Sequence, residues 1–176
     1  MSASDASAVL ITGVYGSGKT SVAEEIADLL EHDGCPYALL DLDYLGWFDS
    51  GQREGHEDQR MMLKNLTAVV GNYRHIGVRF FVVAGCVRDQ AEADGIRAGL
   101  GMSVRIVKIV RLTAPLAEIE RRLRSNVTTA RHHDDLPTAA AWIDASTGVG
   151  SEDLTLPNDR PIREVATEIV AWLGWT

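Results

Sequence analysis

The chain has 176 residues, of which 45% are hydrophobic and 24% charged, the balance of a folded globular domain rather than a disordered chain. Asp and Glu (25) outnumber Lys and Arg (17), so the formal net charge is −8 and the basic field of a nucleic-acid-binding protein is missing. Cys35 and Cys86 are too few and too far apart to suggest a disulfide framework or a zinc site. No apolar run approaches the roughly 20 residues of a membrane span, and Met1–Ala8 lacks signal-peptide features. We therefore expect one cytoplasmic domain over residues 1–176, with neither nucleic acid nor membrane as a partner.

Apolar runs typical of buried strands alternate along the chain with segments of helical period. The expected strands are Ala8–Thr12, Tyr37–Leu40, Val78–Ala84, Val104–Leu112 and Glu152–Leu156. The expected helices are Ser21–Leu30, Glu57–Tyr73, Leu116–Leu123 and Ile162–Leu173. Continuous rather than alternating apolar strands indicate a parallel sheet that is buried on both faces. The pattern predicts an α/β fold, a three-layer α/β/α sandwich with a five-stranded parallel sheet, and ligands at the carboxyl ends of the strands.

A glycine-rich loop follows the first expected strand. Gly13–Thr20 (GVYGSGKT) matches G-x-x-x-x-G-K-[ST] at every position, between an apolar strand and an amphipathic helix. Its glycines let successive backbone N–H groups point into one concavity, and the following helix adds the positive end of its dipole. Lys19 can reach the β- and γ-phosphates, and the Thr20 hydroxyl can ligate Mg²⁺. The residues expected to bind the nucleoside triphosphate are Gly13, Tyr15, Gly16, Ser17, Gly18, Lys19, Thr20 and Ser21.

The loop alone does not separate a kinase from a GTPase or a transporter ATPase. The third and fourth strands end in Gly85-Cys86 and Thr113-Ala114-Pro115, without the acid that hydrolysing ATPases carry at such a strand end. The acids come instead at Asp41 and Asp43, which we expect on one face at the end of the second strand, near the γ-phosphate. Asp43 could orient or deprotonate an acceptor hydroxyl, or help hold Mg²⁺ through water, and Asp41 could contact the acceptor. A solvated turn is the other interpretation of both.

Together, the loop, the Leu-Asp-Leu-Asp end of the second strand and the stretch Asp58–Gly85 resemble small P-loop metabolite kinases. The likeness is to adenylylsulfate kinases first, with gluconate kinases and chloramphenicol phosphotransferases as looser relatives. Asp43 falls on the second Asp of their L-D-G-D motif, and Asp58-Gln59-Arg60 echoes their Asp-x-Arg helix start. Leu42 replaces the motif's glycine, and Ala84-Gly85-Cys86-Val87-Arg88 replaces an Ile-Ser-Pro-Tyr-Arg sequence, with only Arg88 kept as an anion contact. The resemblance implies transfer from ATP and leaves the acceptor open.

Two further segments carry candidate site residues. Around residues 121–135 we expect a lid that brings Arg121, Arg124 and Arg131 onto the transferring phosphate. For each arginine taken singly, a solvated ion pair is the better explanation; the lid is favoured for the group. The loop Leu156–Pro161, with Asn158 and Arg160, packs against the adenine in the resembled kinases; an ordinary turn explains it equally well.

The acceptor pocket is expected beside Asp43. Trp47 and Phe48 would line it and Arg53 would hook an anion, with capping of the core as the alternative for the two aromatic residues. Two functions remain open, and a third, a plain NTP hydrolase, is disfavoured by the missing strand-end acid. The first is an ATP- and Mg²⁺-dependent kinase acting on a small-molecule hydroxyl, in the form of a monomer or homodimer. The second is a nucleotide-binding regulator without transfer.

Overall fold

The computed structural model describes residues 6–48, 55–101, 107–125, 150 and 152–175. Within these ranges, five strands form one sheet, in the order β2-β3-β1-β4-β5 with every neighbouring pair parallel. The strands are β1 (Ser7–Thr12), β2 (Tyr37–Asp41), β3 (Phe80–Ala84), β4 (Val107–Thr113) and β5 (Leu154–Pro157). The predicted parallel α/β fold is confirmed.

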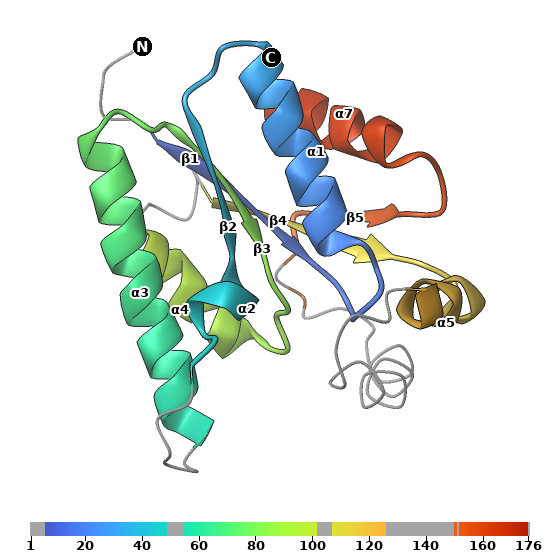
Figure 1. The fold of residues 1–176 in the computed structure, drawn as a ribbon, viewed down its shortest axis with the longest axis horizontal. Helices are drawn as coiled ribbons and strands as arrows, with labels where there is room; N and C mark the ends of the chain where they lie inside the picture. The colour runs from blue at the N-terminus through green and yellow to red at the C-terminus, as the bar shows by residue number, and fades with distance from the viewer. Residues whose placement is uncertain (1–5, 49–54, 102–106, 126–149, 151, 176) are drawn as a thin grey trace.

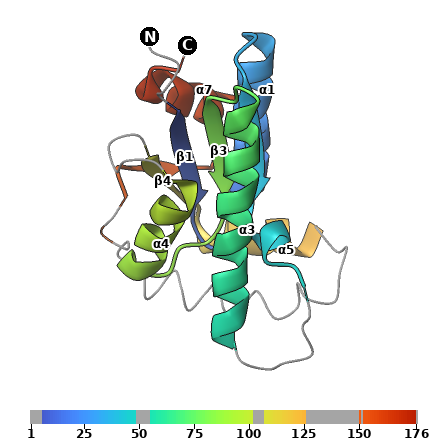
Figure 2. The same ribbon diagram turned by 90° about the vertical axis from the view of Figure 1, so that its left-hand side faces the viewer.

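Helices cover both faces of the sheet. On one face lie α1 (Lys19–His32) and α7 (Ile162–Leu173), and on the other lie α3 (Gly55–His75) and α4 (Gln90–Leu100) (Figures 1 and 2). Two buried apolar clusters, one beneath each helix pair, use alternate residues of the same strands: Val9 and Ile11 face α1, and Leu10 faces α3. The short helix α2 (Leu42–Leu45) and helix α5 (Leu116–Ser125) lie at the carboxyl edge of the sheet (Figure 1).

Sequence analysis missed helix α4, because its sequence QAEADGIRAGL has few apolar residues and two internal glycines. The structure explains these glycines through packing. A Cβ at Gly95 would lie 3.2 Å from a methyl carbon of Leu63, and one at Gly99 would lie 3.1 Å from a methyl carbon of Leu66. The small residues therefore let α4 approach α3 closely. The helix begins at Asp89, whose side chain accepts a hydrogen bond from the Glu92 amide at 2.9 Å.

The remaining boundaries differ by a few residues from the sequence expectation. The start of the expected fourth strand, at Val104, lies outside the described residues, and β4 begins at Val107. None of the helices in the described ranges combines the length and apolar character required to pass through a bilayer.

Candidate functional site

The phosphate loop joins β1 to α1 in the conformation that its glycines permit. Gly13, Gly16 and Gly18 have φ values of 144°, 77° and 93°. A Cβ at position 13 would lie 2.5 Å from the Leu112 carbonyl oxygen, and one at position 18 would lie 2.4 Å from the side-chain nitrogen of Asn158. Both contacts are too short, so these positions require glycine for space as well as for backbone angle.

Lys19 and Thr20 open helix α1, directly after the loop. Lys19 is 8% exposed; its Nζ donates to the Val14 carbonyl at 3.1 Å and lies 5.2 Å from the centre of the Tyr15 ring. The Thr20 hydroxyl donates to Oδ2 of Asp41 at 3.1 Å, which joins the start of α1 to the end of β2. A hydroxyl and a carboxylate held together at a strand end are the oxygen ligands that Mg²⁺ prefers.

The two acids do not share a strand face, and that part of the expectation is wrong. The chain leaves β2 at Asp41 and turns into α2, with Asp43 in its first turn. The other Asp41 oxygen, Oδ1, accepts the Asp43 backbone N–H at 2.9 Å and so caps α2. Asp41 is therefore tied to both Thr20 and α2, and Asp43 is positioned by a helix start.

The rear of the phosphate loop is held by Arg122 of α5 and by Asn158, which follows β5. We call this pair the Arg122–Asn158 clamp. Nη1 of Arg122 donates to the carbonyls of Gly16 at 3.4 Å and Ser17 at 3.2 Å, and Nη2 donates to the Asn158 carbonyl at 2.6 Å. Nδ2 of Asn158, a residue that is 1% exposed, donates to the Ser17 carbonyl at 2.7 Å. The Gly16 and Ser17 carbonyls therefore accept hydrogen bonds from the clamp, which holds the loop on the side opposite its concavity.

Apolar contacts support the same face of the loop. Val14 packs in a small cluster with Ile119 and Leu123 of α5. A Cβ at Gly16 would lie 3.0 Å from a methyl carbon of Ile119, so α5 packs closely against this glycine, whose φ of 77° also disfavours a side chain.

The other candidate arginines lie differently. Arg121 and Arg124 are on the exposed side of α5, where they pair with Glu118 at 2.6 Å and Glu120 at 3.3 Å. Hydrogen bonds from Arg121 and then Arg122 lower the pKa of Glu118 to about 2. Arg160 forms an ion pair with Glu168 of α7. The two remaining candidates, Arg53 and Arg131, lie outside the described residues.

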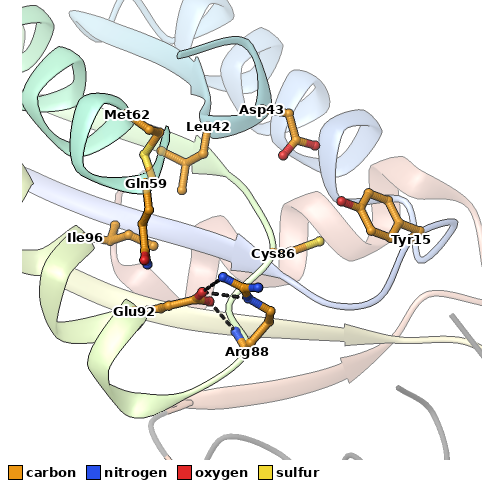
Figure 3. Close-up of a pocket in the computed structure, with 9 residues that line it drawn as sticks. All are labelled: Tyr15, Leu42, Asp43, Gln59, Met62, Cys86, Arg88, Glu92 and Ile96. Carbon is orange, nitrogen blue, oxygen red and sulfur yellow. Dashed lines mark hydrogen bonds and ion pairs between the residues drawn. The ribbon is translucent and has the colours of Figure 1, made fainter. Parts of the chain in front are cut away.

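A cavity of about 300 Å³ opens beside the loop (Figure 3). Its walls come from the loop, α2, α3, the segment after β3, and α4: Tyr15, Leu42, Asp43, Gln59, Met62, Cys86, Arg88, Glu92 and Ile96. The expected residues Asp43 and Arg88 line it. Trp47 and Phe48, which are 59% and 37% exposed, are not among the described residues that line it, and Trp47 stacks on Tyr44 with ring centres 5.7 Å apart.

Cys86 lies between the cavity and the loop, and its thiol donates to the Gly13 carbonyl at 3.4 Å. Burial raises the pKa of this thiol, and the positive charge of Lys19 partly opposes the shift. Among the described residues, no group of three or more His, Cys, Asp or Glu side chains forms a metal-binding cluster.

Sequence reasoning missed Arg122, Gln59, Met62, Cys86, Glu92 and Ile96. Gln59 lies in the Asp-x-Arg echo, Cys86 in the segment after the third strand and Arg122 among the arginines of the expected lid, so these three carried a signal. Which side chains face the loop or the cavity depends on which side of a helix or turn meets the phosphate loop.

The sheet order, the glycine loop before α1 and the adjacent cavity define a protein with the P-loop fold of the small-molecule kinases. A family model described as an AAA domain matches residues 9–136, and the chain belongs to this family. No curated protein matches the sequence.

Solved structures show the same fold. The chain is similar to a sugar kinase from a Janibacter species (20% identity, 96% of this chain and 95% of that one, TM-score 0.67). It is similar to the tunicamycin resistance protein of Deinococcus radiodurans (20% identity, 97% of each chain, TM-score 0.68). It is also similar to the APS kinase of Mycobacterium tuberculosis in complex with AMPPNP and APS (22% identity, 98% and 99% covered, TM-score 0.60).

Proposed function

We propose that this protein is an ATP- and Mg²⁺-dependent phosphotransferase that phosphorylates a hydroxyl group of a small molecule. The observation that carries the proposal is the cavity beside the phosphate loop, with Asp43 and Tyr15 at the end nearest the loop (Figure 3). An acceptor bound in that cavity would face both the Asp43 carboxylate and the phosphate loop on one side. A site built only for hydrolysis has no need of an acceptor cavity.

The residues present fit ATP and Mg²⁺. The loop glycines take the positive φ values that let successive backbone N–H groups point into one concavity, and Lys19 supplies the local positive charge. The Thr20 hydroxyl and the Asp41 carboxylate would hold Mg²⁺, with Asp43 as a further contact through water. Mg²⁺, when bound, neutralises negative charge that builds up on the phosphate oxygens. Ser21 and the loop amides complete the proposed phosphate contacts, and Arg160, near the start of α7, is the proposed contact for the base.

Asp43 is the proposed base. It orients the acceptor hydroxyl and accepts its proton as the oxygen bonds to the γ-phosphorus and the bond to the leaving ADP oxygen breaks. Lys19 holds the phosphates in line, so that positioning and charge stabilisation supply most of the acceleration.

Arg121, Arg124 and Arg131 remain proposed contacts of the transferring phosphate. Arg121 and Arg124 are 69% and 72% exposed, and exposed ion pairs contribute about 0–1 kcal/mol, so replacing either with Gln should leave folding nearly unchanged. A fall in the transfer rate of either variant, with unchanged melting temperature, would support the contact. A rate equal to wild type would remove that arginine from the mechanism.

The test of the function is ATP turnover with and without a panel of hydroxyl compounds, followed by product detection with ³¹P NMR. Asp43→Asn should bind ATP like the wild type and lose transfer by about a hundredfold or more, the scale of general base catalysis. Asp33→Asn, at the far end of α1, removes a carboxylate outside the site and serves as the control. ATP binding without acceptor-dependent turnover would instead favour the nucleotide-binding regulator.

Location and assembly are also proposals. A cytoplasmic homodimer is tested by cell fractionation and by sedimentation velocity of the purified chain.

A further inference from the structure

Tyr15 belongs both to the phosphate loop and to the wall of the cavity. Its side chain is half-buried and packs on the apolar cluster that Val14 forms with two residues of α5, so the ring is held in a fixed position. The same side chain lines the cavity, where its hydroxyl points toward the Asp43 carboxylate (Figure 3). One aromatic side chain therefore lies between the phosphate loop and the proposed acceptor site.

The Tyr15 ring also carries the ammonium group of Lys19. Nζ of Lys19 lies 5.2 Å from the centre of the ring, within the roughly 6 Å over which an aromatic face attracts a cation. The same nitrogen donates to the Val14 carbonyl at 3.1 Å, and Lys19 is buried. Because a cation attracts an aromatic ring more strongly when water is excluded, this contact contributes more here than it would at the surface.

A carboxylate lies near enough to compete for this ammonium group. Cys86 and Asp43 line the same cavity, and the Cys86 thiol donates to the phosphate loop at Gly13. Burial is the largest cause of the raised pKa of this thiol; of the smaller effects, the charge of Lys19 lowers the pKa and that of Asp43 raises it. Lys19 and Asp43 therefore both lie close to Cys86, and they carry opposite charges.

The flexibility of lysine makes this closeness important. A lysine side chain is a compact charge on a flexible stem, so an ammonium group that left the ring and the Val14 carbonyl would be able to turn toward Asp43. An ion pair between Lys19 and Asp43 would remove the positive charge from the phosphates and occupy the proposed base. The fixed Tyr15 ring opposes this movement, because it binds the ammonium group on the phosphate side.

We propose that Tyr15 is a positioning residue, whose ring keeps the Lys19 ammonium group on the phosphate side of the loop and away from the Asp43 carboxylate. Lys19 then meets the β- and γ-phosphates from a preorganised position, which favours ATP binding. This inference rests on the proposed function in that it takes the loop to be the ATP site, but it does not require transfer to an acceptor. ATP binding and NMR therefore test it separately from turnover.

Two substitutions separate the ring of Tyr15 from its hydroxyl and its bulk. Tyr15→Leu keeps an apolar side chain without an aromatic face, and the dissociation constant for MgATP, measured by calorimetry, should rise about fivefold to thirtyfold. Tyr15→Phe keeps the aromatic face and should stay within about twofold of the wild type. Tyr15→Met also lacks the face and should match Tyr15→Leu, so the result does not depend on one variant folding. Tyr73→Leu, on the exposed surface of α3, is the control and should bind MgATP normally.

NMR of protein labelled with ¹³C-lysine observes the contact itself. Protons above an aromatic face resonate upfield, so the ε-methylene signal of Lys19 should be shifted upfield in the wild type and in Tyr15→Phe. Tyr15→Leu should lose most of this shift. Lys108, whose Nζ lies 5.8 Å from the centre of the Trp172 ring, is the internal reference, and its signal should be the same in all three proteins.

Asp43→Asn tests whether the carboxylate is the competitor for the ammonium group. It should leave MgATP affinity unchanged in the wild-type background, but should restore affinity by about fivefold or more in Tyr15→Leu, because the two substitutions are coupled.

The outcomes separate this inference from the kinase function. The expected binding and NMR results without acceptor-dependent turnover would contradict the kinase function and support the positioning role. MgATP affinity of Tyr15→Leu within about twofold of the wild type, or an equal loss in Tyr15→Phe, would overturn the inference. An unshifted Lys19 signal in the wild type, or an equal effect of Asp43→Asn in both backgrounds, would also overturn it.

Discussion

Replacing Arg122 with Met is the sharpest test of how the phosphate loop is held. The substitution keeps an unbranched side chain of about the length of the Arg122 aliphatic stem. It removes the donors to the Gly16, Ser17 and Asn158 carbonyls, and with them the Nε donor to Glu118. A hydrogen bond from a charged donor contributes about 1.5–3 kcal/mol, and the two loop contacts are at the long end of the range. We therefore expect a loss of about 1.5–3 kcal/mol in the ordering of the loop.

Without the guanidinium, ATP binding must order the loop itself, so the ATP dissociation constant should rise about tenfold to a hundredfold. Isothermal titration calorimetry with MgATP measures this directly. Arg163→Met is the control, because Arg163 pairs with Glu25 at 3.0 Å on the outside of α1 and α7. Arg122→Lys should recover little, since Lys lacks the planar fork that spans several carbonyls. A folded Arg122→Met protein with ATP affinity within about twofold of wild type would refute the reasoning.

Three further predictions follow from local features. Gly18→Ala should abolish measurable ATP binding in the same calorimetric assay, since its Cβ would collide with the Asn158 side chain. Gly71→Ala is the control: Gly71 lies in a helix, and a Cβ there would have nothing within 4 Å. This variant should bind ATP normally, and its free energy of unfolding in urea should rise by about 0.5–1 kcal/mol. The Glu118 pKa is lowered from 4.5 to about 2, so its ionised form stabilises the fold above pH 4.5, and this contribution disappears as the pH falls toward 2. In Glu118→Gln the melting temperature should therefore depend less on pH between 4.5 and 2 than it does in the wild type. Parallel pH profiles of the two proteins would contradict this prediction. Burial raises the pKa of Cys86 and disfavours its thiolate, so iodoacetamide should label it at pH 8 more slowly in folded than in urea-unfolded protein, as followed by peptide mass spectrometry; equal rates would rule out the protection.

The sequence predicted the sheet and the phosphate loop well for a physical reason. A buried parallel strand is a continuous apolar run, and the loop's function depends on consecutive residues, so both are local patterns. The sequence also singled out Asp41 and Asp43 as candidate site residues, but it placed both on one strand face, whereas Asp43 lies in helix α2. At Leu42 the chain turns into a helix that Asp41 caps, instead of continuing as a strand. The apolar pattern of the neighbouring residues did not distinguish these two paths.

Helix α4 shows where local patterns fail. Its two glycines weaken any helical signal, and their value appears only when α3 packs against them at Leu63 and Leu66. The helix brings Glu92 into the cavity, so missing it meant missing the partner of Arg88. Tertiary packing overrides helix propensity here.

The arginines of α5 show the same limit at the level of single residues. Arg121, Arg122 and Arg124 are equivalent in sequence as basic residues of one amphipathic helix. Burial of Ile119 and Leu123 against the loop sets the rotation of that helix, so that Arg122 points at the Ser17 carbonyl while Arg121 and Arg124 face solvent. The chain alone thus specifies a P-loop, because eight neighbouring residues build it. The three-dimensional packing of α2, α3, α4 and α5 decides which side chains hold that loop and line the cavity, because those contacts join residues that are distant in sequence.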